Sequence, residues 1–505
     1  MYARSWSSPS AEGSVGSPSF VADHRLWDEA QLAAAERVEA GLDRVDFVRL
    51  VFGDPHGLAR SKTLTAQAFR SALRNGMNFS PGPFIFDTGH AVAVDFLGDH
   101  GIGVGEIAGA GNFILVPDPV TFQMLPGSGP RTAWVIGDEY LRDGTPHPLS
   151  SRAVLRRTLA RYAERGLAPV LGLEVEWYLT RRLDDEAGNT GNGFGLQGEA
   201  PRVAAVNAGY QFNLDAAYDT IAPVTDPLAL HLLELGLPVR SMEHESGPGQ
   251  VETTFSPMSA LDTADAMLLF RTVTKRWCSR SGHHASFMSQ PALDSADPSG
   301  WHLNQSVVET ATGRNLFADG LSGGMSPEGK AYAEGLLAWV RELCLLSVPT
   351  VNGYRRLNVQ HSLAPTRIGL SVEDRTAMLR VVGSGAGAHI ENRVGEPCAN
   401  PYLSIAAQLH AGLDGLAGSS PEATPAPTAP APPAGAADTV PQTLRESLDA
   451  FRSGRAAQVL GGPLASTLAK LKESELNRYE AWCSQTSPAP GQVTQWEQRE
   501  YFGAY

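Results

Sequence analysis

The spacing of apolar residues along the chain predicts helices and short strands in an irregular order. Apolar residues at helical spacing from Val154 to Tyr162 follow Ser150, a good N-cap residue, and stop before Gly166, which predicts a helix. The apolar run 169–179 directly after it predicts a buried strand. Elsewhere, Gly- and Pro-rich turns separate helices from short strands without a regular strand–helix repeat. This pattern indicates an α+β fold.

Proline after an N-cap residue predicts two further helix starts. The two pairs are Asp226-Pro227 and Ser326-Pro327. Proline has no backbone N–H, and the first helical position does not need one. We therefore expect one helix to begin at each pair.

Composition divides the chain into segments. Residues 1–25 are rich in Ser, Gly and Pro and contain no apolar run, so we expect a disordered tail and not a secretory signal. Strand-like segments in 26–143 predict a small sheet-rich domain, and 144–505 is expected to form a larger one. Within the larger domain, 417–442 is rich in Ala and Pro and poor in large apolar residues, which predicts an extended insertion.

Charge and cysteine content exclude several classes of protein. The 505 residues include 54 acidic and 40 basic ones, giving a formal net charge of −14, which argues against a nucleic acid partner. No window holds about 18 uninterrupted apolar residues, so we expect no membrane span. The 4 cysteines form no CxxC pair, which indicates neither a disulfide framework nor a Cys-zinc site. A reducing compartment, the cytoplasm, is the expected location.

Glutamates gather in two motifs. Glu174 and Glu176 stand two residues apart in an apolar strand, so their carboxylates are expected on the same face. The segment 243–252, EHESGPGQVE, places three glutamates and a histidine around a Gly-Pro-Gly turn, so carboxylates at either end of the turn can converge. Carboxylates with one imidazole suit Mg²⁺ or Mn²⁺ better than zinc. The alternatives are an exposed edge strand for the first motif and a solvated acidic turn for the second.

Further candidates lie late in the chain. His302 and Glu391 stand in short strand-like segments, where a lone histidine is more often a core residue than a ligand. Five arginines accompany them: Arg355, Arg356, Arg375, Arg380 and Arg393. Arginine binds carboxylate or phosphate with a two-pronged fork, so carboxylates for metals together with these arginines indicate phosphoryl transfer, with surface salt bridges as the alternative. No P-loop and no strand followed by GxGxxG is present, so a nucleotide would need another architecture.

In order and wording, these motifs resemble the glutamine synthetase family. The matching stretches are LGLEVEWYL (171–179), EHESGPGQVE (243–252), HASFMSQP (284–291), GWHLNQS (300–306), NGYRRL (352–357), DRTAMLR (374–380) and 390–403. The resemblance covers nearly the whole chain from about residue 40. It implies a β-grasp-like N-terminal domain at 26–143 and a catalytic domain at 144–505 with a curved antiparallel sheet. It also implies a ring of subunits, a hexamer or a dodecamer, with active sites between neighbours.

The resemblance implies a role for each matching residue. Two divalent ions, Mg²⁺ or Mn²⁺, would be held by Glu176, Glu245 and Glu252 and by Glu174, His302 and Glu391. Arg356 and Arg393, with Glu176 and His302, would bind glutamate and the transferred phosphoryl group, and Arg375 and Arg380 would act at the γ-phosphate of ATP. Phe255, Asn304 and Ser306 match nucleotide-contact positions. The implied enzyme is an ATP-dependent ligase that forms γ-glutamyl phosphate, which an amine then converts to an amide.

Departures from the family pattern fall around the amine. Leu363 stands where ammonia-using members have a glutamate, and Ser80 stands in a loop where they have an aspartate. Tyr210 and Glu245 are retained at this amine corner. Fewer carboxylates weaken the binding of ammonium and favour a larger, partly apolar amine. The resemblance therefore points to the γ-glutamylpolyamine, γ-glutamylalkylamide and γ-glutamylanilide synthetases, with a neutral or aromatic amine favoured over a polyamine.

Two alternatives remain for the function, and one for the identity of the acid substrate. A true glutamine synthetase would need another group in place of the missing flap glutamate. A non-catalytic structural or sensing relative would not need all six metal-ligand positions, and all six have the right residue type. Because Asp297-Pro298 replaces the family's Asn-Gly beside the glutamate site, an analogue of glutamate stays open as the acid.

Overall fold

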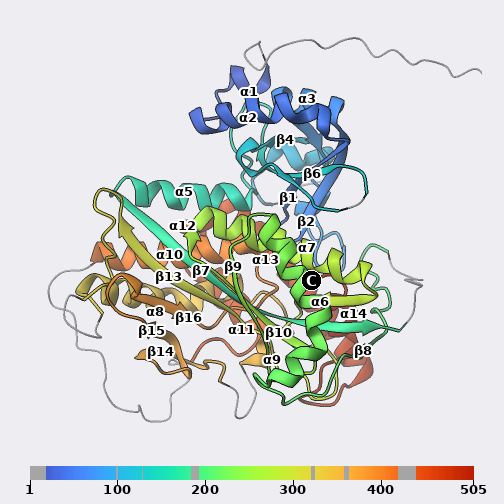
Figure 1. Cartoon of the computed structure of the whole chain (residues 1–505), viewed down its shortest axis with the longest axis vertical. Helices are drawn as coiled ribbons and strands as arrows, with labels where there is room; N and C mark the ends of the chain where they lie inside the picture. Colours follow the sequence, from blue (N-terminus) through green and yellow to red (C-terminus); the bar gives the residue numbers. More distant parts are fainter. Residues whose placement is uncertain are drawn as a thin grey trace, which may run out of the picture. The chain divides into compact units, whose positions relative to one another are not determined.

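The computed structural model describes residues 19–97, 101–127, 129–183, 193–319, 325–357, 363–418 and 439–505 (Figure 1). Most of the predicted tail and insertion, 1–18 and 419–438, lies outside the described residues, but the last part of the predicted tail is ordered, because Phe20–Asp23 form a helix that the Ser19 side chain caps. The chain forms two compact units, a smaller one within 1–52, 60–81 and 109–147 and a larger one within 53–59, 82–108 and 148–505. The domain boundary after residue 143 stays a prediction. The α+β class is confirmed, because helices and sheets are both present in each unit.

The smaller unit is built on a 6-stranded mixed sheet. In the order β2-β1-β6-β4-β3, with β5 beside β6, its strands are β1 (Phe47–Gly53), β2 (Ala59–Thr65), β3 (Met77–Phe79), β4 (Phe113–Pro117), β5 (Gln123–Met124) and β6 (Thr132–Tyr140). Helices α1 (Phe20–Asp23), α2 (Glu29–Gly41) and α3 (Ala66–Asn75) accompany the sheet. The core includes the packed rings of Phe52, Phe79 and Phe113.

The larger unit contains a 10-stranded sheet in the order β14-β15-β16-β13-β7-β10-β9. Its strands are β7 (Leu167–Arg182), β8 (Val203–Ala205), β9 (Val239–His244), β10 (Gln250–Phe255), β11 (Met258–Ser259), β12 (His283–Ser286), β13 (Trp301–Glu309), β14 (Arg367–Val372), β15 (Ala377–Val382) and β16 (His389–Asn392). Strands β8, β11 and β12 also pair with the long β7. The sheet is mixed and not wholly antiparallel as predicted, because β14 and β15 pair in parallel.

The capping rules predict where some helices of the larger unit begin, but not all. They are α4 (Gly82–Ile85), α5 (Ser151–Ala163), α6 (Asp215–Glu234), α7 (Ala260–Arg280), α8 (Pro327–Ser347), α9 (Gly353–Arg356), α10 (Pro401–Gly418), α11 (Leu444–Ser453), α12 (Ala456–Leu460), α13 (Gly462–Thr486) and α14 (Gln495–Tyr501). The side chains of Ser150 and Ser326 cap α5 and α8, as predicted. The start predicted at Asp226-Pro227 is wrong, because α6 already begins at Asp215. Asp226 accepts a hydrogen bond from the Tyr218 hydroxyl, 2.7 Å away, and does not cap a helix.

The two faces of β7 differ in character. Leu173, Val175 and Trp177 are buried on one face, where α7 contributes Phe270 to an aromatic cluster with Phe287. The opposite face carries the polar residues between them in the sequence. Across the ranges that the structure describes, no helix is both long and apolar enough to cross a membrane.

Candidate active site

Strand register brings the predicted carboxylates to one face of the larger sheet. In the antiparallel pairs, Glu252 on β10 lies opposite Glu176, and His302 on β13 lies opposite Glu174. Glu391 on β16 lies opposite Asn304, two residues after His302 and therefore on the same face. The edge-strand alternative is wrong, because β7 lies between β13 and β10. Four neighbouring strands thus contribute to one polar surface.

The Gly-Pro-Gly turn between β9 and β10 is buried against β7, so the solvated-turn alternative is also wrong. Gly249 has φ +72°, and a Cβ at this position would lie 2.3 Å from the carbonyl oxygen of Leu179. Only glycine allows the turn to approach the strand so closely. The Glu245 N–H then donates to the Gln250 carbonyl at 2.9 Å, which holds Glu245 beside the cluster.

The cluster has the geometry of a cation site. One ligand atom from each of Glu174, Glu252 and His302 lies within 4.8 Å of the other two. His302 Nδ1 lies 2.7 Å from Glu174 and 3.4 Å from Glu391. The ligand sets predicted for the two ions therefore adjoin. Glu252 belongs to one set, and Glu174, His302 and Glu391 form the other. A buried oxygen-rich set with one imidazole fits Mg²⁺ or Mn²⁺.

The pKa values show how strongly the cluster needs positive charge. Burial, followed by repulsion from Glu174, Glu176 and Glu245, raises the pKa of Glu252 to about 10. Burial and Glu176 raise the pKa of Glu245 to about 8. Burial acts to raise the pKa of Glu174 as well, but His302 and its hydrogen bond outweigh it and lower that pKa to about 2. A divalent cation would offset both the cost of burial and the mutual repulsion that keep protons on Glu245 and Glu252.

We expect the stabilisation of the protein by Mn²⁺ to grow with pH between about 6.5 and 9, by up to about 1.4 kcal/mol per pH unit for each proton displaced. The metal-free fold holds protons on Glu245 and Glu252 well above the pKa of 4.5 that these groups have when unperturbed. Their contribution to its stability is present below that value and is lost as pH rises through the folded pKa. Mn²⁺ needs both carboxylates ionised, so its binding must release these protons. This release costs less free energy at high pH, and the stabilisation by Mn²⁺ therefore grows with pH.

Chemical unfolding over this pH range, with EDTA and with Mn²⁺, measures the effect. The difference between the two conditions cancels the contributions of titrating groups remote from the cluster, such as His147 and Lys275. A stabilisation by Mn²⁺ that is independent of pH would contradict the prediction.

Sequence reasoning assigned no individual role to two polar residues that belong to this surface. Gln250 donates from Nε2 to Glu176 at 3.2 Å and to Ser299 Oγ at 3.0 Å. Glu243 lies on β9 opposite Glu252, and its buried Oε2 has no hydrogen-bond partner among the described residues. Both stand inside the EHESGPGQVE motif. The pairing of β9 with β10 places Glu243 on the same face as Glu252, and the spacing of residues within the motif could not predict this pairing.

Three of the predicted arginines lie at the cluster. Arg393 pairs with Glu391, and Arg380 reaches the same carboxylate at 3.0 Å. Their Nε atoms are buried and have no hydrogen-bond partner among the described residues. Arg356 is 4% exposed, and its Nη2 lies 3.2 Å from His302 Nε2. Arg375 lies in the exposed turn between β14 and β15, where no hydrogen bond or ion pair joins it to the cluster among the described residues, and its role stays a prediction.

The nucleotide-contact candidates separate into two groups. Asn304 and Ser306 continue the polar face of β13, and Asn304 donates to Glu174 at 3.3 Å. The ring of Phe255 instead packs against Phe270 at 5.1 Å between centroids, in the core on the other face. A contact of Phe255 with a nucleotide would therefore have to come from its backbone.

Three of the amine-corner candidates are exposed, and the fourth, Glu245, is half-buried. Tyr210, 80% exposed, and Leu363, 56% exposed, lie in the larger unit. The Tyr210 N–H donates to the Ser246 carbonyl, next to Glu245. Ser80 follows β3 in the smaller unit, and its place relative to the cluster is not described.

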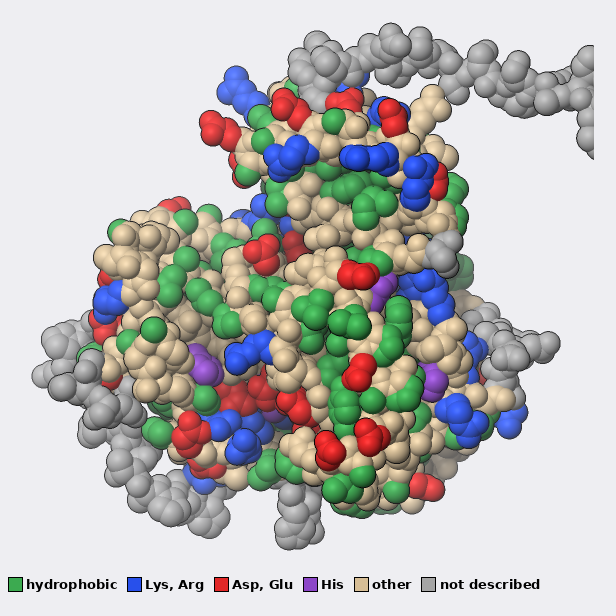
Figure 2. Space-filling view, viewed as in Figure 1, with side chains coloured by type: hydrophobic (Ala, Val, Ile, Leu, Met, Phe, Trp, Pro, Cys, Tyr) green, Lys and Arg blue, Asp and Glu red, His purple; other side chains and the backbone are tan. Residues whose placement is uncertain are grey.

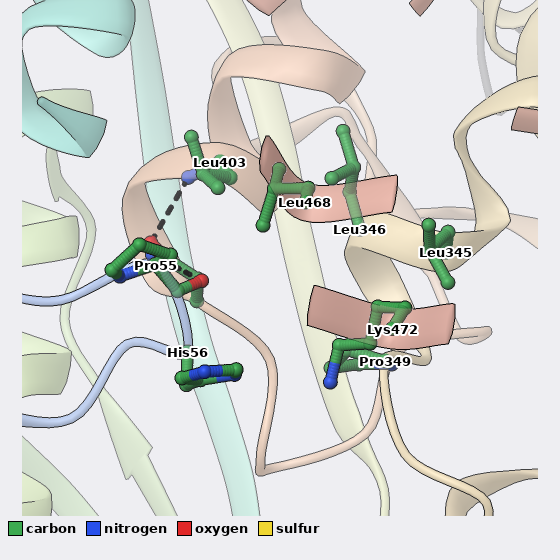
Figure 3. Close-up of a pocket in the computed structure, with 9 residues that line it drawn as sticks. Pro55, His56, Leu345, Leu346, Pro349, Leu403, Leu468 and Lys472 are labelled. Carbon is green, nitrogen blue, oxygen red and sulfur yellow. Dashed lines mark hydrogen bonds between the residues drawn. The ribbon is translucent and has the colours of Figure 1, made fainter. Parts of the chain in front are cut away.

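Acidic and basic side chains lie together in a hollow of the larger unit (Figure 2). A separate cavity is lined by Pro55, His56, Leu345, Leu346, Pro349, Asn400, Leu403, Leu468 and Lys472 (Figure 3). None of the predicted site residues lines this cavity, and its walls are mainly apolar. Lys472, its cationic residue, is already paired with Glu475 at 2.7 Å. The chemistry therefore belongs to the carboxylate cluster.

Comparison with known proteins agrees with this geometry. Residues 148–491 match the catalytic domain of glutamine synthetase. A γ-glutamylanilide synthase from Acinetobacter sp. is 37% identical over 496 residues, which span 96% of this chain and 98% of that protein. A γ-glutamylpolyamine synthetase from Streptomyces coelicolor is 32% identical over 90% of this chain and 94% of its own. The solved structure of apo GmaS without ligand is 26% identical, with a TM-score of 0.71 over 92% of this chain and 98% of that one.

Proposed function

The chain belongs to the glutamine synthetase family of ATP-dependent C–N ligases, and we propose that it joins the γ-carboxylate of glutamate to an amine other than ammonia. Among such amines we propose an aromatic or apolar one. The likeness to a γ-glutamylanilide synthase over 96% of the chain supports this choice. The ring assembly and the cytoplasmic location stay predictions.

The observation that carries the proposal is an apolar loop beside Glu245. The Tyr210 N–H donates to the Ser246 carbonyl and the Asn213 N–H donates to the His244 carbonyl at 2.9 Å, so the loop is bonded on both sides of Glu245. Its side chains Tyr210, Phe212 and Leu214 are 80%, 61% and 51% exposed. An amine whose nitrogen lies near Glu245 would find an apolar surface for its organic part.

The backbone of this loop is strained, which fits a functional role. Tyr210 has φ +61° and Asn213 has φ +51°, values in the left-handed region that a large side chain such as tyrosine adopts rarely. Such conformations persist where the surroundings impose them, and they concentrate at binding sites.

In the proposed reaction, the chain's own residues mainly orient the substrates and neutralise their negative charge. Arg356 and Arg393 would bind the acid, and the γ-carboxylate oxygen attacks the γ-phosphorus of ATP while ADP leaves. The amine nitrogen then attacks the acyl carbon of γ-glutamyl phosphate, loses a proton, and phosphate leaves. Divalent ions held by the cluster would supply charge neutralisation at the phosphoryl group. Arg380 and Arg393, which both pair with Glu391, would add positive charge beside the same oxygens.

A panel of amines tests the proposal directly. The purified protein is incubated with ATP, glutamate and Mg²⁺ or Mn²⁺ and with ammonia, alkylamines, polyamines or aromatic amines, and phosphate release and the amide product are measured. We expect the highest kcat/KM with an aromatic or apolar amine. Ammonia as the best substrate would make the protein a glutamine synthetase, and the absence of phosphate release with every amine would indicate a non-catalytic relative.

Phe212→Ala is expected to lower kcat/KM for an aromatic amine by about tenfold, because an aromatic contact is worth on the order of 1 kcal/mol beyond the area it buries. The same variant should change kcat/KM for ammonia little, since ammonia has no organic part. Leu230→Ala is a matched control, because Leu230 is a 65% exposed residue of α6. Equal losses for both amines would contradict a role of Phe212 in amine binding.

A further inference from the structure

Arg356 stands in a helix too short to hold its own position. Helix α9 comprises only Gly353–Arg356, and the side chain of its N-cap residue, Asn352, makes no capping hydrogen bond. A single helical turn is unstable by itself, because few hydrogen bonds compensate the ordered backbone. The position of the Arg356 guanidinium must therefore come from tertiary contacts.

One set of those contacts comes from Glu497 of α14, about 140 residues later in the chain. Its carboxylate is fully buried and pairs with Arg355 through both oxygens, with Arg355 Nη2 donating at 2.6 Å. Asn352 Nδ2 donates to the same carboxylate at 3.1 Å. Glu497 also closes the capping box of its own helix, where it accepts from the Thr494 N–H at 2.8 Å.

A second set of contacts holds the segment that leads into α9. The Val351 N–H donates to the Tyr501 hydroxyl at 3.3 Å, so α14 bonds this segment at two places. The Asn352 Oδ1 accepts from the Gln290 N–H at 2.7 Å, which ties the turn to the HASFMSQP segment. Pro349, just before it, lines the cavity of Figure 3 beside Lys472 of α13.

Helix geometry assigns different tasks to the two adjacent arginines. Consecutive residues of a helix point about 100° apart, so Arg355 can face α14 while Arg356 faces the sheet. Arg356 Nη1 donates to the Arg393 carbonyl at 2.8 Å, and its Nη2 lies beside His302. A Cβ on Gly300 would lie 2.7 Å from this Nη2, so the guanidinium occupies a closely fitted place. Any rotation of α9 would displace it.

We propose that Glu497 is a positioning residue for the acid substrate: through its ion pair with Arg355 it fixes α9 in the orientation that presents Arg356 to the substrate carboxylate. This role rests on the proposed function, in which Arg356 binds glutamate. The physical reason is preorganisation. A binding group held in place before the substrate arrives loses little entropy on binding, and a small misplacement weakens both binding and catalysis.

Glu497→Gln tests the proposal, with Glu500→Gln as the matched control on the same helix. Glutamine can still accept the capping hydrogen bond at this position of a capping box, but it cannot form the two-oxygen ion pair with Arg355. Glu500 pairs with Arg478 and not with α9. We expect Glu497→Gln to raise the KM for glutamate about tenfold with a smaller change in the KM for ATP, and to speed hydrogen exchange in 350–357. Glu500→Gln should lower the melting temperature without either change.

A second variant, Arg355→Gln, removes the other partner of the pair and should raise the KM for glutamate in the same way. An unchanged KM in both variants would overturn the proposal, and so would faster exchange in 350–357 without a change in KM. If the wild-type protein does not turn over glutamate, the proposed function fails. The exchange experiment would then still decide whether Glu497 holds α9.

Discussion

Glu252→Gln is expected to remove metal-dependent activity and yet to stabilise the metal-free protein. Burial and the neighbouring glutamates hold the pKa of Glu252 at about 10, so the folded protein keeps a proton there at neutral pH that the unfolded chain has released. Holding that proton at pH 7 costs about 3 kcal/mol, and a neutral glutamine of the same shape avoids the cost. The same change removes an anionic oxygen from the cation site, so we expect activity to fall by roughly a thousandfold.

Unfolding by urea in EDTA and calorimetric titration with Mn²⁺ measure the two effects separately. The wild-type protein should gain stability from Mn²⁺, and the variant should gain far less. Glu309→Gln is the matched control, because Glu309 ends β13 in an exposed pair with Arg314. A Glu252→Gln variant that is less stable than wild type in EDTA, or that binds Mn²⁺ equally well, would refute the assignment of Glu252.

The local sequence pattern was sufficient to predict part of this site. The two-residue spacing predicted that Glu174 and Glu176 share a face, because side-chain direction in a strand is a local property. The meeting of Glu252, His302 and Glu391 on that face depends on the register of strands far apart in the chain, and no local pattern determines that register. Here the expectation came from the resemblance to the family, whose membership the comparisons confirm.

Local rules failed where tertiary partners compete with them. Asp226-Pro227 has the form of a helix start, but Asp226 bonds Tyr218 within α6 and the helix continues through the proline. The nucleotide contact that the resemblance implies for Phe255 stays a prediction, and it would come from the backbone, because the Phe255 ring packs with Phe270 on the core face of the sheet. Glu497 could not be predicted as a partner of Arg355, since nothing near either residue in the sequence identifies the other.

Arg356→Lys is expected to lower kcat/KM for glutamate by roughly a hundredfold to a thousandfold, although the charge is nominally conserved. Arg356 Nη1 lies within hydrogen-bond distance of the carbonyl oxygens of Arg393, Val394 and Gly395, while Nη2 reaches His302. One lysine ammonium cannot serve the carbonyl groups and also bind a carboxylate in two-pronged fashion.

The loss of kcat/KM in Arg356→Lys should also become larger as pH rises. This pH dependence distinguishes a loss of charge from a loss of hydrogen-bond geometry. Burial lowers the pKa of Arg356 to about 10, so the guanidinium stays charged at neutral pH. A lysine starts from a pKa of about 10.4, and the same burial would bring its pKa to about 8, so it would lose its charge at mildly alkaline pH. The kcat/KM of the variant should therefore fall above about pH 8 relative to wild type. Arg314→Lys, at an exposed arginine, provides the control, and a variant profile parallel to that of wild type would show that the fork geometry alone matters.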